Sequence, residues 1–252
     1  TNYDGWKTID FVGLTNYITL FKDSKFYLSL GRTLLYTVCT LPFRVIIPLL
    51  VAVLLCSKRV AGKSLTRTMV YIPVLMSSLV VGITINWMFS QEYGLVNFII
   101  RSLGGTALEW SLNPRLATFV IAFASVWASI GFNMILYIGG INSISNDLYE
   151  AATIDGASGV QAFFRITVPM LAPTTFMVVL LSTVNLLKEY ALVQGITQGG
   201  PGLSTTFIIQ YIFDKGFNQM QYGYASAIST VVMIIFALIA FAQFKVNNGG
   251  ET

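Results

Sequence analysis

Five apolar segments, each long enough to cross a lipid bilayer, dominate this sequence of 252 residues. Four of them contain no charged residue and the first contains one, Arg44; the segments are 33–56, 68–90, 116–142, 166–187 and 216–244. At a rise of about 1.5 Å per residue, about 20 helical residues cover the roughly 30 Å hydrocarbon core. None of the segments alternates polar and apolar residues as a barrel strand does. The sequence therefore predicts an all-α polytopic membrane protein with five transmembrane helices.

The composition excludes several other classes of protein. Charged residues make up 10% of the chain and hydrophobic residues 55%, whereas a soluble domain carries about 25% charged residues. A soluble enzyme, a secreted disulfide scaffold and a disordered regulator are therefore excluded. The chain has no histidine, which removes His-based triads and most zinc sites. Cys39 and Cys56 lie in one apolar segment and resemble small core residues. We expect no metal, no bound cofactor and no catalytic residue.

The distribution of lysine and arginine predicts the orientation, because cytoplasmic loops of membrane proteins are enriched in them. Segment 57–67 contains Lys58, Arg59, Lys63 and Arg67 and no acidic residue, whereas cations and acids balance in 91–115. The net charge of +4 is explained in this way, and no long basic patch points to nucleic acid. Segments 57–67, 143–165 and 246–252 are then predicted to be cytoplasmic, and 91–115 and 188–215 external.

With this orientation the chain would begin outside the membrane. We expect residues 1–28 to be an external segment that follows a first helix absent from this sequence. Residues 29–245 are predicted to form one transmembrane domain, and residues 246–252 a cytoplasmic tail.

The cytoplasmic segment 143–169 is unusually structured for a loop. Asp147 can cap the first of two short helices with Glu150 as its reciprocal partner, and Ser158 with Gln161 forms a second capping box. Gly156 stands where a left-handed residue ends a helix. Pro169 suits the first turn of the next span. Two interpretations remain open: a connector packed on its own bundle, or a docking element for a cytoplasmic partner.

Polar residues inside the spans are candidates for a solute pathway, because such residues are costly in the bilayer. A sugar would need hydrogen-bonding groups beside an aromatic face, so the candidates are Arg44, Trp127, Asn133, Asn185 and Glu189. Each also has a structural interpretation. Arg44 could be satisfied by carbonyls freed at Pro42 and Pro48, Glu189 could pair at the interface with Lys188, and Trp127, Asn133 and Asn185 could pack between helices.

Two external segments are predicted to contain short surface helices. The stretch from Phe207 to Phe213 follows a turn cluster around Gly199–Gly202 and is expected to lie along the membrane surface. Segment 94–104 has the spacing of an amphipathic helix, with Leu95, Phe98, Ile99 and Leu103 on its apolar side.

The spacing of the cytoplasmic segment resembles the EAA motif of ABC importer permeases. Glu150-Ala151-Ala152 is followed after three residues by Gly156, and nine residues later by Ile166-x-Val168-Pro169. Val168 departs mildly from the leucine usual in that family. Val12-Gly13-Leu14-x-Asn16-Tyr17, Thr197-x-Gly199-Gly200-Pro201 with Thr205, and Gly223-Tyr224-Ala225-Ser226-Ala227 extend the resemblance to the maltose and glycerol-phosphate group. Within that group the chain resembles the permease subunit that carries a Gly-Gly-Pro segment.

This resemblance implies a type I importer permease with at least six helices in the full subunit. It implies a heterodimer with a second permease, two copies of an ABC ATPase that hold ATP and Mg²⁺, and an external solute-binding protein. The coupling loop would act through Glu150, Ala151, Ala152, Asp155, Gly156, Ala157, Phe163, Ile166 and Pro169.

The chain itself is predicted to hydrolyse no ATP. Gly62-Lys63-Ser64 resembles the end of a P-loop, but Ser57 stands where the first glycine is required. Three alternatives remain open: an ion-coupled secondary transporter, a structural membrane scaffold, and an importer permease for a non-sugar solute such as glycerol phosphate.

Overall fold

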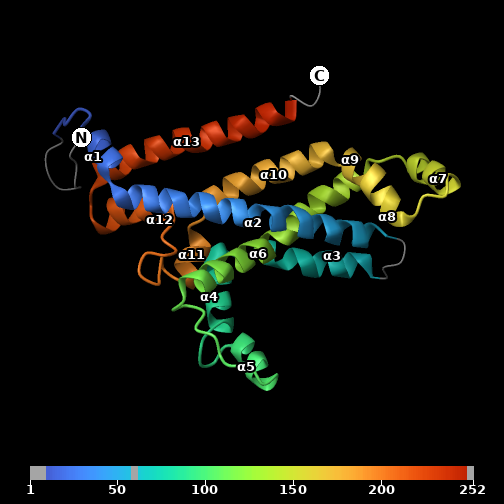
Figure 1. The fold of residues 1–252 in the computed structure, drawn as a ribbon, viewed down its shortest axis with the longest axis horizontal. Coiled ribbons are helices and arrows are strands. Elements are labelled where there is room, and N and C mark those ends of the chain that lie inside the picture. Colours follow the sequence, from blue (N-terminus) through green and yellow to red (C-terminus); the bar gives the residue numbers. More distant parts are fainter. Residues whose placement is uncertain (1–9, 58–61, 249–252) are drawn as a thin grey trace. The chain divides into compact units, whose positions relative to one another are not determined.

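The computed structural model describes residues 10–57 and 62–248, and every regular element among them is a helix (Figure 1). Their bounds are α1 Thr15–Lys22, α2 Ser24–Cys56, α3 Lys63–Tyr71, η1 Ile72–Leu75, α4 Ser78–Met88, α5 Leu95–Ser102, α6 Pro114–Asn142, α7 Asn146–Ile154, α8 Gly159–Ala162, η2 Phe163–Thr167, α9 Val168–Met170, α10 Ala172–Leu187, α11 Ala191–Ile196, α12 Ile208–Phe213, η3 Asp214–Asn218 and α13 Tyr222–Asn248. The prediction of an all-α protein is confirmed.

Three helices are continuous and apolar enough to span a membrane: Ser24–Cys56, Pro114–Asn142 and Tyr222–Val246. The predicted spans 68–90 and 166–187 are instead bent pairs. Lys63–Leu75 and Ser78–Met88 meet at 101°, and Gly159–Met170 and Ala172–Leu187 at 66°. Counting each bent pair as one span gives up to five. Two of the five runs are therefore not the straight helices that hydropathy alone suggested.

Prolines explain where these two spans break. Pro73 lies in η1, shortly before Met76 adopts an extended backbone, and Pro169 and Pro173 flank the bend at Leu171. A proline has no N–H to donate and its ring crowds the carbonyl four residues earlier, so helices bend beside it.

The chain divides into two compact units. Unit 1 consists of the described residues within 1–39, 78–125 and 184–252, and unit 2 of those within 40–77 and 126–183. The core of unit 1 is formed by Leu20, Phe26, Ile208, Tyr211, Ile228 and Val232. The core of unit 2 is formed by Ala52, Leu55, Met134, Tyr137, Ile138, Ile144, Leu171 and Val178.

In unit 1, α4 and α11 pack with their backbones in close contact. A Cβ atom added to Gly82 would lie 2.9 Å from the Leu192 carbonyl oxygen and 3.0 Å from Gly195 Cα. One added to Gly195 would lie 2.8 Å from the Leu79 carbonyl oxygen. Such an approach is possible only because both positions lack a side chain.

The segment after α4 is ordered by one buried amide. Asn97 Nδ2 donates to the carbonyls of Gln91 at 3.1 Å and Leu108 at 3.0 Å, and its Oδ1 accepts from Trp110 Nε1 at 3.0 Å. The predicted helix over 94–104 is present as α5. Leu95, Phe98, Ile99 and Leu103 are exposed, as expected of a helix with one apolar side.

The prediction that Phe207–Phe213 lies along the membrane surface was wrong. This stretch forms α12, but Phe207, Ile208 and Tyr211 are buried in unit 1 rather than exposed to lipid. The Ile208 N–H donates to Thr33 Oγ1 at 2.9 Å, and the Phe207 ring lies 4.6 Å from that of Tyr36. The last span also begins later than predicted, at Tyr222, because 214–218 form the π-helical turn η3.

Part of the positively charged segment 57–67 belongs to a helix. Lys63 and Arg67 lie on α3, so the second span begins before the predicted residue 68. Lys58 and Arg59 lie outside the described residues, as do residues 1–9 and 249–252 of the two predicted terminal segments.

A carboxylate joins three elements of unit 1. Asp23, between α1 and α2, accepts hydrogen bonds from Tyr211 Oη on α12 and, at 2.6 Å, from Tyr224 Oη on α13. Burial by itself would raise the pKa of Asp23, but the hydrogen bonds from the two phenols and from the backbone N–H groups of Lys25 and Phe26 together outweigh it and hold the pKa below the ordinary 3.8. Burial and the Asp23 carboxylate raise the pKa of Tyr211.

We expect Asp23→Asn to lower the free energy of unfolding by about 1.5–3 kcal/mol, because hydrogen bonds to a charged group are lost. The folded pKa lies below the unfolded one, so this stabilisation is complete above pH 3.8 and is lost as pH falls through the folded pKa. Thermal melts at pH 7 and pH 5 should show the same loss relative to wild type. Exposed Asp10 supplies the control, Asp10→Asn, and a difference that closes at pH 5 would contradict the depressed pKa.

Candidate functional site

The first short helix of segment 143–169 is α7, and its N-cap differs from the prediction. Ser145 has an extended backbone and its Oγ accepts the Asp147 N–H at 3.2 Å, so Ser145 rather than Asp147 is the cap. Asp147 lies in the first turn, where its negative charge interacts favourably with the helix dipole. Glu150 is exposed. The cap stands one turn before the Glu150-Ala151-Ala152 sequence and fixes where that helix begins.

The end of α7 confirms the predicted role of Gly156. Its φ of +78° is left-handed, and the Gly156 N–H donates to the Thr153 carbonyl at 3.1 Å. The Ala157 N–H donates to the Ala152 carbonyl at 2.8 Å. These two bonds form a Schellman motif, which reverses the chain after Asp155. A Cβ at Gly156 would meet no atom within 4 Å, so glycine is required by the backbone conformation and not by crowding.

The second short helix begins with the predicted capping box. The Ser158 N–H donates to Gln161 Oε1 at 2.7 Å, and the Gln161 N–H donates to Ser158 Oγ at 3.3 Å. Helical backbone continues through the π-helical turn Phe163–Thr167 to Met170. Pro169 therefore lies in the last turn before the bend and not in the first turn of α10, which is a correction to the prediction.

The two short helices are fastened to each other and to the core of unit 2. Tyr149 Oη and Thr167 Oγ1 share a hydrogen bond of 2.9 Å. The side chains of Tyr149 and Ile166 pack against the hydrophobic cluster of unit 2. Ala152, Ala157 and Phe163 are half-buried. The connector interpretation is therefore correct for one side of the segment.

The other side of the segment exposes apolar side chains. Ile154 is 86% exposed, Val160 68% and Phe164 65%, and Glu150, Ala151, Asp155 and Gly156 are exposed as well. Ile154 is the last residue of α7 and Val160 is in the first turn of α8. Large apolar side chains gathered on a rigid corner are typical of a surface that another protein covers. This side favours the docking interpretation.

Arg44 and Asn133 are brought together within unit 2. Both are buried, and Asn133 Nδ2 on α6 donates to the Arg44 carbonyl on α2 at 2.9 Å and to Ser182 Oγ on α10 at 3.2 Å. In a regular helix the Arg44 carbonyl would accept from the N–H of residue 48, but residue 48 is proline. The Asn133 amide supplies the missing donor. This geometry supports a packing role for Asn133 between helices, which is one of the two interpretations that the sequence left open.

We expect Asn133→Leu to lower the free energy of unfolding by about 1–3 kcal/mol, since the Arg44 carbonyl and Ser182 lose a buried donor. Pro48→Ala restores an N–H to α2, so the double variant Asn133→Leu/Pro48→Ala should recover much of this loss. Thermal unfolding of the four proteins in one detergent measures the coupling. Strictly additive effects would contradict the assignment.

The other pathway candidates occupy different surroundings. Trp127, in unit 2, is partly exposed on α6. Asn185 and Lys188 are exposed in unit 1, near the end of α10. Glu189 is buried, and its Oε1 accepts the Leu192 N–H at 3.3 Å in the first turn of α11. A carboxylate at that place satisfies a free helical N–H and interacts favourably with the helix dipole. The structure thus gives Glu189 a capping role.

The Gly-Gly-Pro segment forms a hydrogen-bonded loop in unit 1. Thr205 is fully buried; its Oγ1 lies 2.6 Å from the Gly200 carbonyl oxygen and 2.7 Å from Thr197 Oγ1. Gln198, Gly199 and Gly202 have positive φ. The predicted turn cluster is confirmed, and the threonines that accompany it hold its ends together.

Known proteins resemble this chain over most of its length. Residues 17–248 match the family described as binding-protein-dependent transport system inner membrane component. The probable ABC transporter permease protein YurN of Bacillus subtilis (strain 168) is 34% identical over 244 residues, 96% of this chain and 84% of that protein. The arabinooligosaccharides transport system permease protein AraP of the same strain is 32% identical over 244 residues, 95% of this chain and 77% of that protein.

A solved structure has the same fold. It is that of a bacterial ABC transporter involved in the import of the acidic polysaccharide alginate, and it matches with a TM-score of 0.85 at 24% identity. The match covers 94% of this chain and 84% of that one.

Proposed function

This chain belongs to the family of binding-protein-dependent transport system inner membrane components, and we propose that it forms half of the pathway through which an ATP-driven importer takes up a saccharide. It is an ABC importer permease of the type I fold and a multi-pass membrane protein. Permease subunits are not enzymes. We do not propose an ion-coupled secondary transporter, because membership of a binding-protein-dependent transport family already explains the features of this chain.

The corner between α7 and α8 carries the coupling proposal. Ile154, Val160 and Phe164 are exposed on a corner fixed by a Schellman motif and a capping box, which suits insertion into a cleft of an ATPase subunit. The attachment through Tyr149 and Ile166 to the core of unit 2 would pass a displacement of this corner to the spans. ATP and Mg²⁺ would be bound by the two ATPase copies and not by this chain.

The remaining partners follow from the same proposal. A second permease would complete the pathway, and an external solute-binding protein would deliver the solute. Segment 57–67 would face the cytoplasm, in accordance with its positive charge. By alternation of the spans, 143–165 would then lie on the same side and the loops 91–115 and 188–215 would face outward. A saccharide is supported by AraP, whose name specifies arabinooligosaccharides.

Gentle detergent purification of the tagged full-length subunit, followed by mass spectrometry of the co-purified proteins, tests this function. We expect a P-loop ATPase and a second permease in defined stoichiometry. Isolation of a stable oligomer of this chain alone, with solute uptake that needs no ATPase, would refute the proposal.

A further inference from the structure

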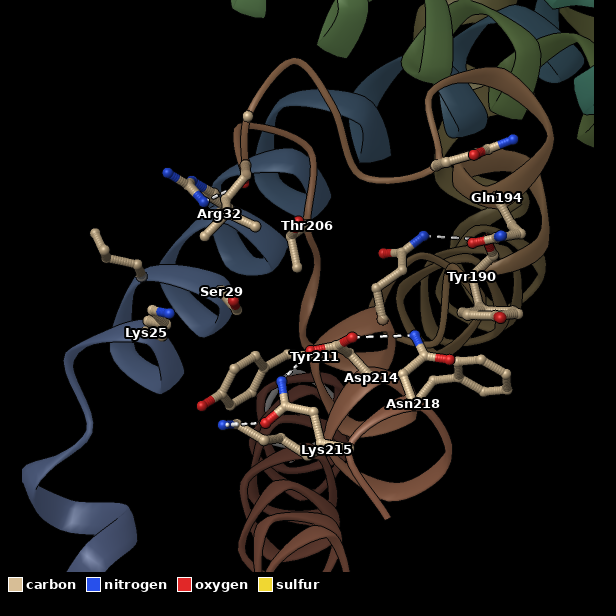
Figure 2. A pocket seen from close by; sticks show the side chains of 17 residues that line it. Lys25, Ser29, Arg32, Tyr190, Gln194, Thr206, Tyr211, Asp214, Lys215 and Asn218 are labelled. Carbon is tan, nitrogen blue, oxygen red and sulfur yellow. Dashed lines mark hydrogen bonds between the residues drawn. The ribbon is translucent and has the colours of Figure 1, made fainter. Parts of the chain in front are cut away.

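Unit 1 contains a polar cavity of about 430 Å³ that none of the predicted pathway residues lines (Figure 2). Its walls come from the first three turns of α2, from α11 with the residue before it, from the loop between α11 and α12, and from α12 and η3. The volume lies within the range of small-molecule sites in proteins. The surrounding residues are contributed by three separate stretches of the chain.

One wall presents Lys25, Ser29 and Arg32, which are spaced four and three residues apart and so share a face of α2 (Figure 2). Ser29 is only 3% exposed, yet within the described part of the chain its hydroxyl has no hydrogen-bond partner. The Lys25 ammonium is likewise unpartnered there. Arg32 donates one N–H to the Leu203 carbonyl and keeps its other donors. This wall therefore offers free donors beside two positive charges.

The facing wall presents Tyr190 and Gln194, one helical turn apart (Figure 2). Neither the Tyr190 hydroxyl nor the Gln194 amide is hydrogen-bonded by a described residue, and the same holds for the nearby Gln198 side chain. Gln198 has a φ of +52°, a conformation that costs energy for a residue other than glycine and is found often at binding sites. The Tyr190 ring, 5.2 Å from that of Phe213, adds an aromatic surface.

The polar side chains on the floor of the cavity are already hydrogen-bonded to one another. Asp214 accepts hydrogen bonds from Asn218 Nδ2 at 3.0 Å and Gln219 Nε2 at 2.7 Å, while Lys215 Nζ donates to Gln219 Oε1 at 2.9 Å. The charges of Asp214 and Lys215 balance across this network. Among the residues that line the cavity, the cations Lys25, Arg32 and Lys215 outnumber the one carboxylate, Asp214, so the cavity attracts an anionic group.

Free amide, hydroxyl and phenol groups opposite two cations suit a particular class of ligand. Saccharides present hydroxyl rims and apolar C–H faces, which amides and aromatic rings bind. A carboxylate on the sugar would meet Lys25 and Arg32. A lipid phosphate would instead favour cations and backbone N–H groups that converge from several sides. Here Lys25 and Arg32 lie on one wall, and the third lining cation, Lys215, donates to Gln219 Oε1.

We propose that this cavity is a saccharide-binding site in addition to the pathway candidates, and that it takes a sugar unit bearing a carboxylate. The proposal rests on the function proposed above and narrows its substrate class. Lys25 and Arg32 bind the carboxylate, Gln194 and Ser29 bind hydroxyls, and Tyr190 packs against the ring.

The test compares two matched probes on the assembled transporter in nanodiscs, without the solute-binding protein. Digalacturonate and galactobiose with the same α-1,4 linkage differ only at C6, which is a carboxylate in the first and a hydroxymethyl group in the second, and calorimetry measures the binding of each. We expect digalacturonate to bind about tenfold or more tightly, as a charge-assisted hydrogen bond would give. Lys25→Gln should remove most of that preference and leave the affinity for galactobiose unchanged. Gln194→Leu should weaken the binding of both probes.

Lys22→Gln provides the matched control, because Lys22 is an exposed cation at the end of α1 that does not line this cavity. Equal affinity for the two probes, no binding of digalacturonate, or the same result for Lys25→Gln and Lys22→Gln would overturn the inference. So would complete displacement of digalacturonate by phosphatidylglycerol. Failure of the ATPase to co-purify would refute the proposed function instead, so the two failures are distinguishable.

Discussion

Replacing Gly156 by alanine should remove most solute uptake while leaving the subunit in the membrane. The Cβ atom meets open space, so the effect comes from the left-handed φ of +78°. That conformation costs an L-residue about 1–2 kcal/mol, which is roughly tenfold or more in the equilibrium between the turned corner and alternatives. ATPase co-purification and uptake by the reconstituted transporter should fall together, because the exposed corner would no longer hold its shape.

Two further variants separate conformation from bulk. A Cβ at Gly159 also meets no atom within 4 Å, and its φ is not positive, so Gly159→Ala should transport normally. Gly156→Asn should retain much of the activity, since asparagine tolerates the left-handed region better than alanine. Equal activity of Gly156→Ala and Gly159→Ala would show that the Schellman motif is not needed for coupling.

Gly195→Val should prevent unit 1 from folding stably. A Cβ at residue 195 would lie 2.8 Å from the Leu79 carbonyl oxygen and 2.9 Å from both Gly82 Cα and the Ile83 nitrogen. These are backbone atoms that no side-chain rotation can move, so α4 and α11 would have to separate. Overpacking of a close contact costs about 1–3 kcal/mol or more. The yield of folded protein after detergent extraction and the thermal midpoint should both drop.

Gly139 supplies the comparison for this variant. It lies on α6, and a Cβ there meets no atom within 4 Å. Gly139→Val should therefore behave nearly as the wild type. If Gly195→Val melted at the same temperature as Gly139→Val, this result would contradict a close backbone contact between α4 and α11.

Prediction from sequence succeeded where a feature depends on neighbouring residues. The capping box at Ser158 and the left-handed turn at Gly156 each require residues within six positions, and their spacing is visible in the chain. The N-cap of α7 was misplaced because Ser145 and Asp147 are both good caps, and only the extended backbone of Ser145 decides between them.

Features that depend on tertiary packing could not be predicted. Hydropathy does not show that the spans containing Pro73 and Pro169 bend, since apolar runs continue through both breaks. The stretch around Ile208 has the composition of a surface helix, yet it is buried because Thr33 and Tyr36 lie beside it. The cavity lined by Lys25 and Gln194 carries no motif, because common polar residues form it from distant parts of the sequence.

The hydrogen bond from Asn133 to the Arg44 carbonyl has a consequence for how these positions change in evolution. The amide is needed because Pro48 withholds an N–H from α2. A lineage that exchanges the proline for another residue regains that donor within the helix, and selection on residue 133 is then relaxed. Positions 48 and 133 should therefore vary together among relatives, with a polar residue on α6 wherever α2 keeps its proline and apolar replacements permitted where it does not.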